Sequence, residues 1–275
     1  MMKVLRIVEP LSRSLARSAS SATGSKTHFG FQNVTEEEKA EKVFHVFENV
    51  ATKYDLMNDT MSFGTHRLWK DYFVDKLGPM SDISLLDMAG GTGDIAARVA
   101  RYIRNNDAVE PTGRIVIGDI NPHMLEVGRR KLENANLAKG LEWVEADAEK
   151  LPFDAETFDA YTIAFGIRNC VHVQKVIDEA YRVLRPGGRF MCLEFSRVNN
   201  ALLEWLYEKY SFEVIPVMGQ LIAGDWESYQ YLVESIRKFP DQGTFAEMIR
   251  SSGFRAVNYE NLTSGVVAIH SGFKL

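Results

Sequence analysis

The chain has few cysteines, no long apolar run and no excess of positive charge. Its only two cysteines, Cys170 and Cys192, form neither a disulfide framework nor a metal-binding spacing. No stretch reaches the roughly 18 consecutive apolar residues of a membrane span, and residues 214–224 come nearest. The formal net charge of −5 gives no basic footprint for nucleic acid. We therefore expect a reducing compartment, no metal site, no nucleic-acid partner and no membrane span.

The first 27 residues differ in kind from the rest of the chain. They carry five basic residues and many serines but a single acid, Glu9. The basic and apolar residues fall on opposite sides of a helical wheel, as in a mitochondrial transit peptide, although Pro10 weakens a helix there. A tail with accidental charge is the alternative. We expect a leader at 1–27, a helical lid at 28–82 and the main domain at 83–275, with a helical insertion at about 197–240.

Strand and helix signals alternate through the main domain. Strands are expected at 84–88, 114–119, 141–146, 158–165, 189–195, 255–260 and 266–273, with helices at 94–106, 122–134, 173–184 and 242–252. Such alternation predicts an α/β fold: a doubly wound, mostly parallel, seven-stranded Rossmann-like sheet. The last two strands are close enough to form an antiparallel hairpin at its edge. Before the sheet, the capping-box pattern from Thr35 to Glu38 predicts the start of a helix.

A glycine-rich turn follows the first expected strand of this sheet. Asp87 is followed by Ala89-Gly90-Gly91-Thr92-Gly93-Asp94, in which the glycines allow a sharp turn and close approach of a ligand to the next helix N-terminus. Ligands of open α/β sheets bind beyond the carboxyl ends of the strands. Those ends also offer Asp119, and Asp147 with Ala148. We expect a nucleotide-like cofactor at this edge.

Two cofactors compete for that edge. Residues 91–96 satisfy the dinucleotide fingerprint, which alone is a weak signal. Asp94 would repel a pyrophosphate at the helix N-terminus, and the one Tyr-x-x-x-Lys motif precedes the loop. For S-adenosylmethionine the same acids help, because Asp87 or Asp94 can approach the ammonium, Asp119 the ribose, and Asp147 with Ala148 the adenine. A helix cap is the structural alternative for Asp119.

Three motifs then make the reading more specific. The first is Asp-x-Ala-Gly-Gly-Thr-Gly at 87–93. The second is Tyr-Asp-x-Met-Asn…Ser-x-Gly-x-His-x-x-Trp at 54–69. The third is Phe-Gly-Ile-Arg-Asn at 165–169, which is joined by Arg-Val-Leu-Arg-Pro-Gly-Gly and Glu-Phe-Ser between 182 and 196. The first resembles the loop of class I methyltransferases. Together they resemble the ubiquinone/menaquinone biosynthesis C-methyltransferases from about residue 27 to the end. The resemblance implies S-adenosylmethionine-dependent methylation of a ring carbon on a polyprenylated benzoquinol.

The resemblance also assigns site residues. It implies cofactor contacts at Thr92, Asp119, Asp147 and Ala148, to which the loop reasoning adds Gly91, Gly93 and Asp87. It implies a catalytic cluster of Arg168, Asn169 and Tyr54. A serine of bacterial relatives is replaced by Ala164, so one polar contact to the cofactor is absent or comes from the backbone.

Two further side chains complete the expected cluster. A guanidinium is a poor base because it stays protonated, so we expect Arg168 to stay cationic and the proton to pass to a water near Asn169 or to His66. The structural alternatives are an Arg168 ion pair with Asp55 or Asp59 and a merely packed His66. Glu194, at a strand end, should act indirectly, by closing the pocket or binding Arg168.

The expected partners follow from the substrate's long tail. The insertion supplies a large apolar set, of which about half should pack on the sheet: Leu202, Leu203, Trp205, Leu206, Tyr210, Phe212, Val214, Ile215, Val217, Met218, Leu221, Ile222 and Trp226. We expect peripheral contact with the inner mitochondrial membrane from the matrix side. The resemblance also implies a multi-subunit quinone-biosynthesis complex, and a homodimer stays open. The alternative functions are a methyltransferase for another lipophilic phenol, a dehydrogenase, and a non-catalytic scaffold.

Overall fold

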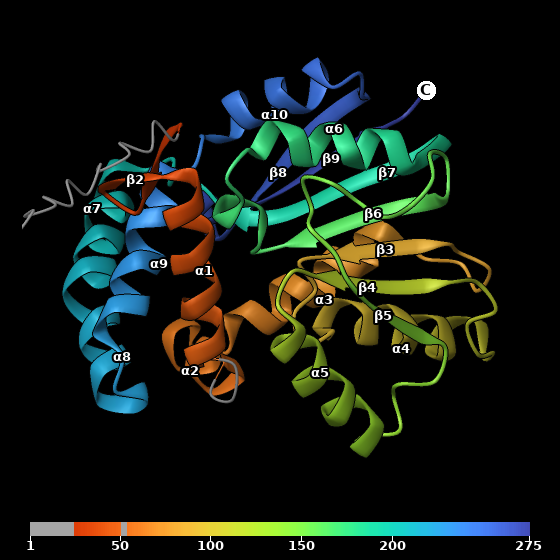
Figure 1. The fold of residues 1–275 in the computed structure, drawn as a ribbon, viewed down its shortest axis with the longest axis horizontal. Coiled ribbons are helices and arrows are strands. Elements are labelled where there is room, and N and C mark those ends of the chain that lie inside the picture. Colours follow the sequence, from red (N-terminus) through yellow and green to blue (C-terminus); the bar gives the residue numbers. More distant parts are fainter. Residues whose placement is uncertain (1–24, 51–53) are drawn as a thin grey trace, which may run out of the picture.

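The computed structural model describes residues 25–50 and 54–275, so the expected transit peptide lies almost entirely outside the described residues. Seven strands form the main sheet in the order β5-β4-β3-β6-β7-β9-β8 (Figure 1). Their bounds are β3 Leu85–Met88, β4 Ile115–Asp119, β5 Leu141–Glu145, β6 Phe158–Ala164, β7 Leu184–Phe195, β8 Arg255–Leu262 and β9 Val267–Phe273. Strands β3 to β7 are parallel, and β9 runs antiparallel to both β7 and β8. The predicted architecture, including the edge hairpin, is confirmed.

Helices cover both faces of this sheet because the strands alternate buried side chains between two apolar cores. One core joins Leu85 and Ile117 to α3 (Thr65–Leu77) and α4 (Asp94–Asp107), with α5 (Pro122–Asn134) beside them. The other joins Leu86 and Phe190 to α6 (Val173–Val183) and α10 (Gln242–Ser251). Both cores extend to the carboxyl ends of the strands, where the sequence predicts the site.

The largest boundary difference in the sheet concerns β7. The sequence predicts this strand at 189–195, but β7 begins at Leu184, directly after α6, and includes Pro186-Gly187-Gly188. Gly187 adopts a φ of 84°, and its N–H donates to the carbonyl of Lys274 at 2.6 Å. Pairing with the C-terminus therefore extends the strand through a sequence typical of a turn.

The N-terminal part begins with a hairpin that the sequence did not predict. It pairs β1 (Lys26–Phe29) with β2 (Gln32–Thr35), so Lys26 and Thr27, assigned above to the leader, lie in a strand. Helix α1 (Glu36–Val50) follows and has the predicted capping box: the Thr35 N–H donates to Glu38 Oε2 at 2.8 Å, and the Glu38 N–H to Thr35 Oγ1 at 3.2 Å.

The motif at 54–69 covers α2 (Tyr54–Ser62) and the start of α3. Phe63 and Gly64, with φ values of 51° and 75°, separate the two helices. This left-handed break therefore divides the motif between two helices.

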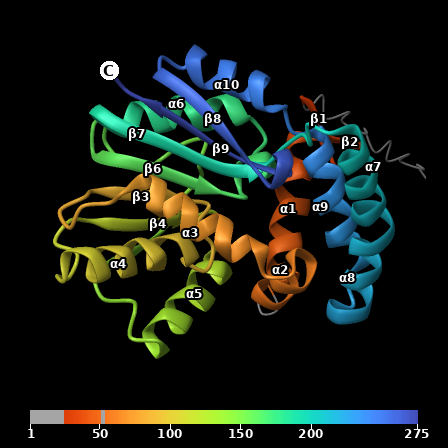
Figure 2. The same cartoon turned by 180° about the vertical axis from the view of Figure 1, so that it is seen from behind.

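The insertion after β7 forms α7 (Ala201–Lys209), η2 (Tyr210–Val214), α8 (Ile215–Ala223) and α9 (Trp226–Lys238). These helices lie beside α1 and α2 at one end of the sheet in both views (Figures 1 and 2). The N-terminal hairpin is attached to α9, because Phe29 stacks on Tyr231 at 4.0 Å between ring centroids and the Phe31 N–H donates to the Glu234 carboxylate at 2.9 Å. Within the described residues, no helix is both long and apolar enough to span a membrane.

Candidate active site

A cavity of about 420 Å³ lies over the carboxyl ends of β3, β4 and β6. We call it the glycine-loop cavity. Its wall contains Gly90, Gly91 and Thr92, and α1 covers it from the N-terminal side. Of the predicted cofactor residues, it brings together Gly91, Thr92, Asp119, Asp147 and Ala148.

The loop needs its glycines for close packing. A Cβ at Gly90 would lie 2.8 Å from Ile117 Cγ2, and Gly91 has a φ of 52°. Gly93 is not in the cavity wall; its φ of 74° starts α4, and a Cβ there would lie 2.8 Å from the Trp143 ring. Gly93 therefore shapes the loop, whereas Gly90 and Gly91 present backbone to the cavity.

Asp119 is fixed in place at the tip of β4. Its Oδ2 accepts from the Gly91 N–H at 2.8 Å, and its Oδ1 accepts from the Asn121 N–H at 2.9 Å. Burial raises the pKa of this carboxyl, and the N–H donors of Asn121 and Gly91 oppose the rise. Asn121, rather than Asp119, caps α5. Each carboxylate oxygen keeps a lone pair for a ligand hydroxyl.

The two other loop acids have different surroundings. Asp87 is 1% exposed and is not part of the cavity wall; it accepts from Thr162 Oγ1 at 2.9 Å and from the Ala96 N–H at 3.3 Å. Burial raises the pKa of Asp87 to about 7. Asp94 is in the wall and accepts from Lys70 Nζ at 2.8 Å. Burial disfavours its ionisation, but Lys70 and Arg98 prevail and lower its pKa to about 2.

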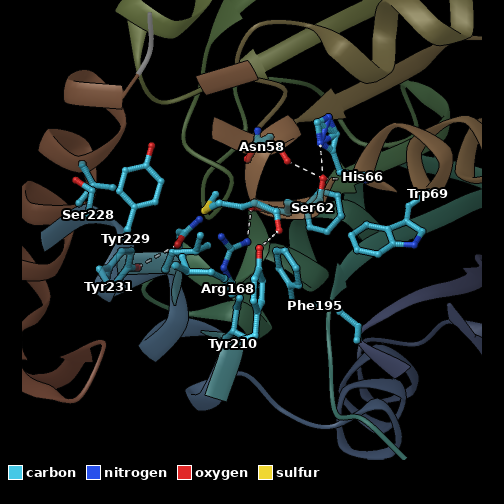
Figure 3. A pocket seen from close by; sticks show the side chains of 18 of the residues that line it. Asn58, Ser62, His66, Trp69, Arg168, Phe195, Tyr210, Ser228, Tyr229 and Tyr231 are labelled. Carbon is cyan, nitrogen blue, oxygen red and sulfur yellow. Dashed lines mark hydrogen bonds between the residues drawn. The ribbon is translucent and has the colours of Figure 1, made fainter. Parts of the chain in front are cut away.

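A second, mostly apolar cavity of about 130 Å³ adjoins the first, and we call it the Arg168 cavity (Figure 3). Its wall combines α2, α3 and the insertion helices, with Trp69 and Phe195 on one side and Tyr229 and Tyr231 on the other (Figure 3). Both cavities share four wall residues: Phe47, Lys70, Phe165 and Asn169. A ligand in one therefore lies beside a ligand in the other.

Arg168 reaches this cavity from η1 (Ile167–Asn169) and is held by a buried ion pair. Its Nη1 donates to Glu194 Oε1 at 2.9 Å and to the carbonyl of Phe165 at 2.5 Å. Its partner is thus Glu194, not Asp59, which accepts two hydrogen bonds from Arg67 at 2.6 Å. Burial raises the pKa of Glu194, and Arg168 opposes that rise. Of the two alternatives expected for Glu194, the structure therefore shows binding to Arg168.

Only one of the two polar atoms of the Asn169 side-chain amide has a hydrogen-bond partner among the described residues. Its Oδ1 accepts from the Tyr231 hydroxyl at 3.1 Å, whereas its Nδ2 is buried and has no hydrogen-bond partner among the described residues. The amide therefore has a donor available at the junction of the two cavities. Sequence reasoning missed Tyr231, because the helical spacing of α9 does not show which tyrosine faces the site.

His66 lines the Arg168 cavity, with its Nδ1 3.3 Å from Ser62 Oγ and its Nε2 3.5 Å from Asp59. Burial, assisted by Lys70, lowers the pKa of His66 to about 4. The ring is therefore neutral at pH 7 and is a weak base. Tyr54 begins α2, but its side chain lies outside the described part of the chain.

The N-terminal helix closes the rim of the glycine-loop cavity. His172 bridges two acids, with Nε2 3.1 Å from Glu36 and Nδ1 2.7 Å from Glu149. Lys39 Nζ donates to the carbonyl of Cys170 at 2.9 Å. These contacts join α1 to the loops after β5 and β6, so α1 lies over the rim of the glycine-loop cavity.

Comparison with known proteins agrees with this geometry. The family model described as "ubiE/COQ5 methyltransferase family" matches residues 33–274. The chain is 58% identical over 274 residues, 96% of this chain and 91% of the relative, to "2-methoxy-6-polyprenyl-1,4-benzoquinol methylase, mitochondrial" of Drosophila melanogaster. The protein of the same name from Danio rerio is 55% identical over 282 residues, 93% of this chain and 86% of that one.

A solved structure is also similar in fold. A crystal structure of a SAM-dependent methyltransferase from Thermotoga maritima has a TM-score of 0.59 at 19% identity, covering 85% of this chain and 100% of that one. At this identity the likeness supports the Rossmann-like fold alone.

Proposed function

The chain belongs to the ubiE/COQ5 methyltransferase family, and on this premise we propose that it methylates a ring carbon of 2-methoxy-6-polyprenyl-1,4-benzoquinol, using S-adenosylmethionine. The observation that carries the proposal is the pair of adjoining cavities that share Phe165 and Asn169. One is acidic at the strand tips and the other is apolar around Arg168. Two different ligands can thus lie side by side, as a group transfer requires.

The glycine-loop cavity fits S-adenosylmethionine in size and in chemistry. A volume of about 420 Å³ falls in the range of small-molecule sites. Asp119 presents two oriented oxygens suited to the ribose hydroxyls, and Asp147 with the small Ala148 suits the adenine. When bound, the cofactor supplies an electrophilic sulfonium methyl group. This fit favours a methyltransferase over the dinucleotide reading of the same loop.

The Arg168 cavity suits the ring of the acceptor but not its tail. Its volume of about 130 Å³ is similar to that of an engineered protein cavity of about 150 Å³ that binds benzene. The polyprenyl chain must then lie outside it. We propose that the tail follows α7, η2 and α8, because Tyr207, Tyr210 and Ile215 of these elements line the cavity.

The residues perform two tasks in this reaction. Trp69, Phe165 and Phe195 hold the ring plane and exclude water from it, which contributes to positioning. Arg168 stabilises negative charge on the neighbouring hydroxyl, and that charge activates the ring carbon. The Asn169 Nδ2 donor, which has no partner among the described residues, would hold the same oxygen or a water that takes its proton. His66, with a pKa of about 4, is a poor proton acceptor.

The test of this role is the pH dependence of an Arg168→Ala enzyme. We expect it to lose most of its rate at neutral pH and to recover part of it as rising pH ionises the acceptor without help. An equal loss at every pH would contradict the charge role and leave Arg168 as a structural residue.

The direct test of the reaction uses labelled S-adenosylmethionine and a short-chain demethyl benzoquinol. Transfer of label to the ring carbon is the expected product, identified by mass spectrometry. A simple lipophilic phenol serves as the comparison acceptor. Equal turnover of both would contradict the assigned substrate while leaving the methyltransferase activity intact.

The chain is mitochondrial, as the names of its relatives indicate, and we propose peripheral contact with the inner membrane from the matrix side. Of the twelve apolar insertion residues named above whose exposure the structure describes, nine are exposed, among them Leu202 at 67% and Leu221 at 80%. An exposed apolar face continuous with the acceptor cavity would let a membrane-dissolved tail reach the site. Liposome flotation of the wild type and of a Leu202→Ser/Leu221→Ser variant tests this, since equal flotation of both would contradict it.

The leader and the assembly state are also proposals. We propose that the leader before β1 acts as a transit peptide and that the enzyme joins a multi-subunit quinone-biosynthesis complex, with homodimerisation open. Import into isolated mitochondria with and without the leader tests the first. Cross-linking in mitochondria, with light scattering of the pure enzyme, tests the second and counts its copies.

A further inference from the structure

The wall of the glycine-loop cavity is rich in acids and poor in cations. It includes the carboxylates of Glu36, Asp94, Asp119, Asp147 and Glu149. Among the described residues that line it, Lys70 is the single lysine or arginine. Lys70 is only 7% exposed and projects from α3, which packs on one face of the sheet. A buried ammonium in such a wall needs an explanation, because burying a charged side chain is costly.

Asp94 explains only part of this placement. Lys70 Nζ donates to Asp94 Oδ2 at 2.8 Å, and its distance to the centroid of the Phe165 ring is 6.0 Å. An ammonium has three donors, and Asp94 takes the one hydrogen bond that Lys70 makes among the described residues. Asp94 also has a second cation, since Arg98 Nε lies 3.5 Å from its Oδ1. Lys70 thus keeps donors that can face a ligand.

The strand order says which end of the cofactor reaches Lys70. Asp147 follows β5, Asp119 ends β4, the glycine loop follows β3, and Phe165 follows β6, and these strands are neighbours in that order. If adenine lies at Asp147 and ribose at Asp119, the amino-acid end lies next to the glycine loop. Lys70, beside Asp94 and Phe165, is at that end.

We propose that Lys70 binds the α-carboxylate of the methionine part of S-adenosylmethionine. The amino-acid end of this cofactor carries one ammonium and one carboxylate. The cavity offers several acids for the ammonium and one cation for the carboxylate. This assignment rests on the proposed function, because it requires that cofactor in the glycine-loop cavity. Lys70 also borders the Arg168 cavity, so the same contact fixes the cofactor next to the acceptor.

The test compares two ligands that differ only in the carboxylate: S-adenosylmethionine and its decarboxylated form. Titration calorimetry should show that the wild type binds the carboxylated ligand more tightly. Lys70→Met should weaken binding of S-adenosylmethionine by about 10- to 100-fold, the range for a charged hydrogen bond. It should change binding of the decarboxylated ligand little, so that the affinity ratio falls towards one. Lys70→Arg should retain most of the preference.

A matched control separates this role from support of Asp94. Arg98 also contacts Asp94, and it pairs with Asp71 at 2.8 Å, but it does not line the cavity. Arg98→Met should leave the affinity ratio unchanged. Equal weakening of both ligands in Lys70→Met would overturn the proposal and leave Lys70 as a structural ion pair. Failure of the wild type to bind either ligand would instead refute the proposed cofactor.

Discussion

Replacing Glu194 with glutamine should change both stability and pH dependence, because it removes the anion that is paired with Arg168. Glu194 is 1% exposed, and its Oε1 accepts from Arg168 at 2.9 Å and from the Phe195 N–H at 2.9 Å. Its Oε2 is buried and has no hydrogen-bond partner among the described residues. Glutamine keeps an oxygen for both donors but leaves the guanidinium without a counter-charge.

The expected stability loss follows from the burial of the pair. Breaking a buried pair costs about 3–5 kcal/mol, and the retained hydrogen bonds place Glu194→Gln near the lower end. For a chain of this size, a loss of about 3 kcal/mol lowers the melting temperature by about 6–12 °C. Calorimetry at constant pH measures this.

The same substitution should shift the pH dependence of the reaction to lower pH. Removing the negative charge of Glu194 beside Arg168 favours the ionised acceptor hydroxyl by on the order of 2 kcal/mol at an effective dielectric constant of about 20. The pKa of the bound hydroxyl then falls. In the profile of single-turnover rate against pH, the acidic limb, where the rate declines as the pH is lowered, moves to lower pH by between about one and two units.

Glu179→Gln is the control for these measurements. Glu179 pairs with Arg182 at 2.6 Å on α6 and lines neither cavity. It should leave the acidic limb in place. An unmoved limb in Glu194→Gln, or a limb moved to higher pH, would show that the charge of Arg168 does not reach the acceptor and would refute the proposed activation.

Three other predictions concern single residues. His66→Asn should lower the rate less than about tenfold and leave the acidic limb unmoved, because the pKa of His66 is about 4. If the acidic limb disappears from the rate–pH profile of this variant, His66 is the base. Asp119→Asn should weaken S-adenosylmethionine binding by about 10- to 100-fold in calorimetric titrations, whereas unchanged affinity would return Asp119 to a structural role. The pKa of Asp87 is raised from 3.8 to about 7, so the folded state binds the proton more tightly, and this stabilisation is full below pH 4 and lost as pH rises through 7. Urea unfolding should therefore show that the free energy of unfolding declines by up to about 4 kcal/mol over that range. Asp87→Asn should largely remove this decline. An equal decline in the variant would show that another group causes it.

The sheet could be predicted from sequence because its signals are local. Helix α5 has the predicted bounds, since Pro122 and the Asn121 cap fix its start. The glycine loop and Asp119 were found for a similar reason, as each follows a buried strand directly. The strand tips then determined which residues share the glycine-loop cavity.

The Arg168 cavity could not be predicted in full, because its wall depends on contacts between distant segments. The pairing of Arg168 with Glu194 joins residues 26 positions apart, and the Tyr231 contact with Asn169 joins residues 62 apart. The hairpin of β1 and β2 was missed because its short strands carry mostly polar residues. Its stability comes from α9, about 200 positions later.

That hairpin has a practical consequence for anyone shortening the gene for expression. A product that starts at the capping box of α1 would keep every residue named in the glycine-loop cavity. It would lose the aromatic ring that backs Tyr231 and the amide that holds Glu234. Such a shortened enzyme should still retain the methyl donor on a column while turning over its quinol poorly, and a purification judged by donor affinity alone would not reveal the defect.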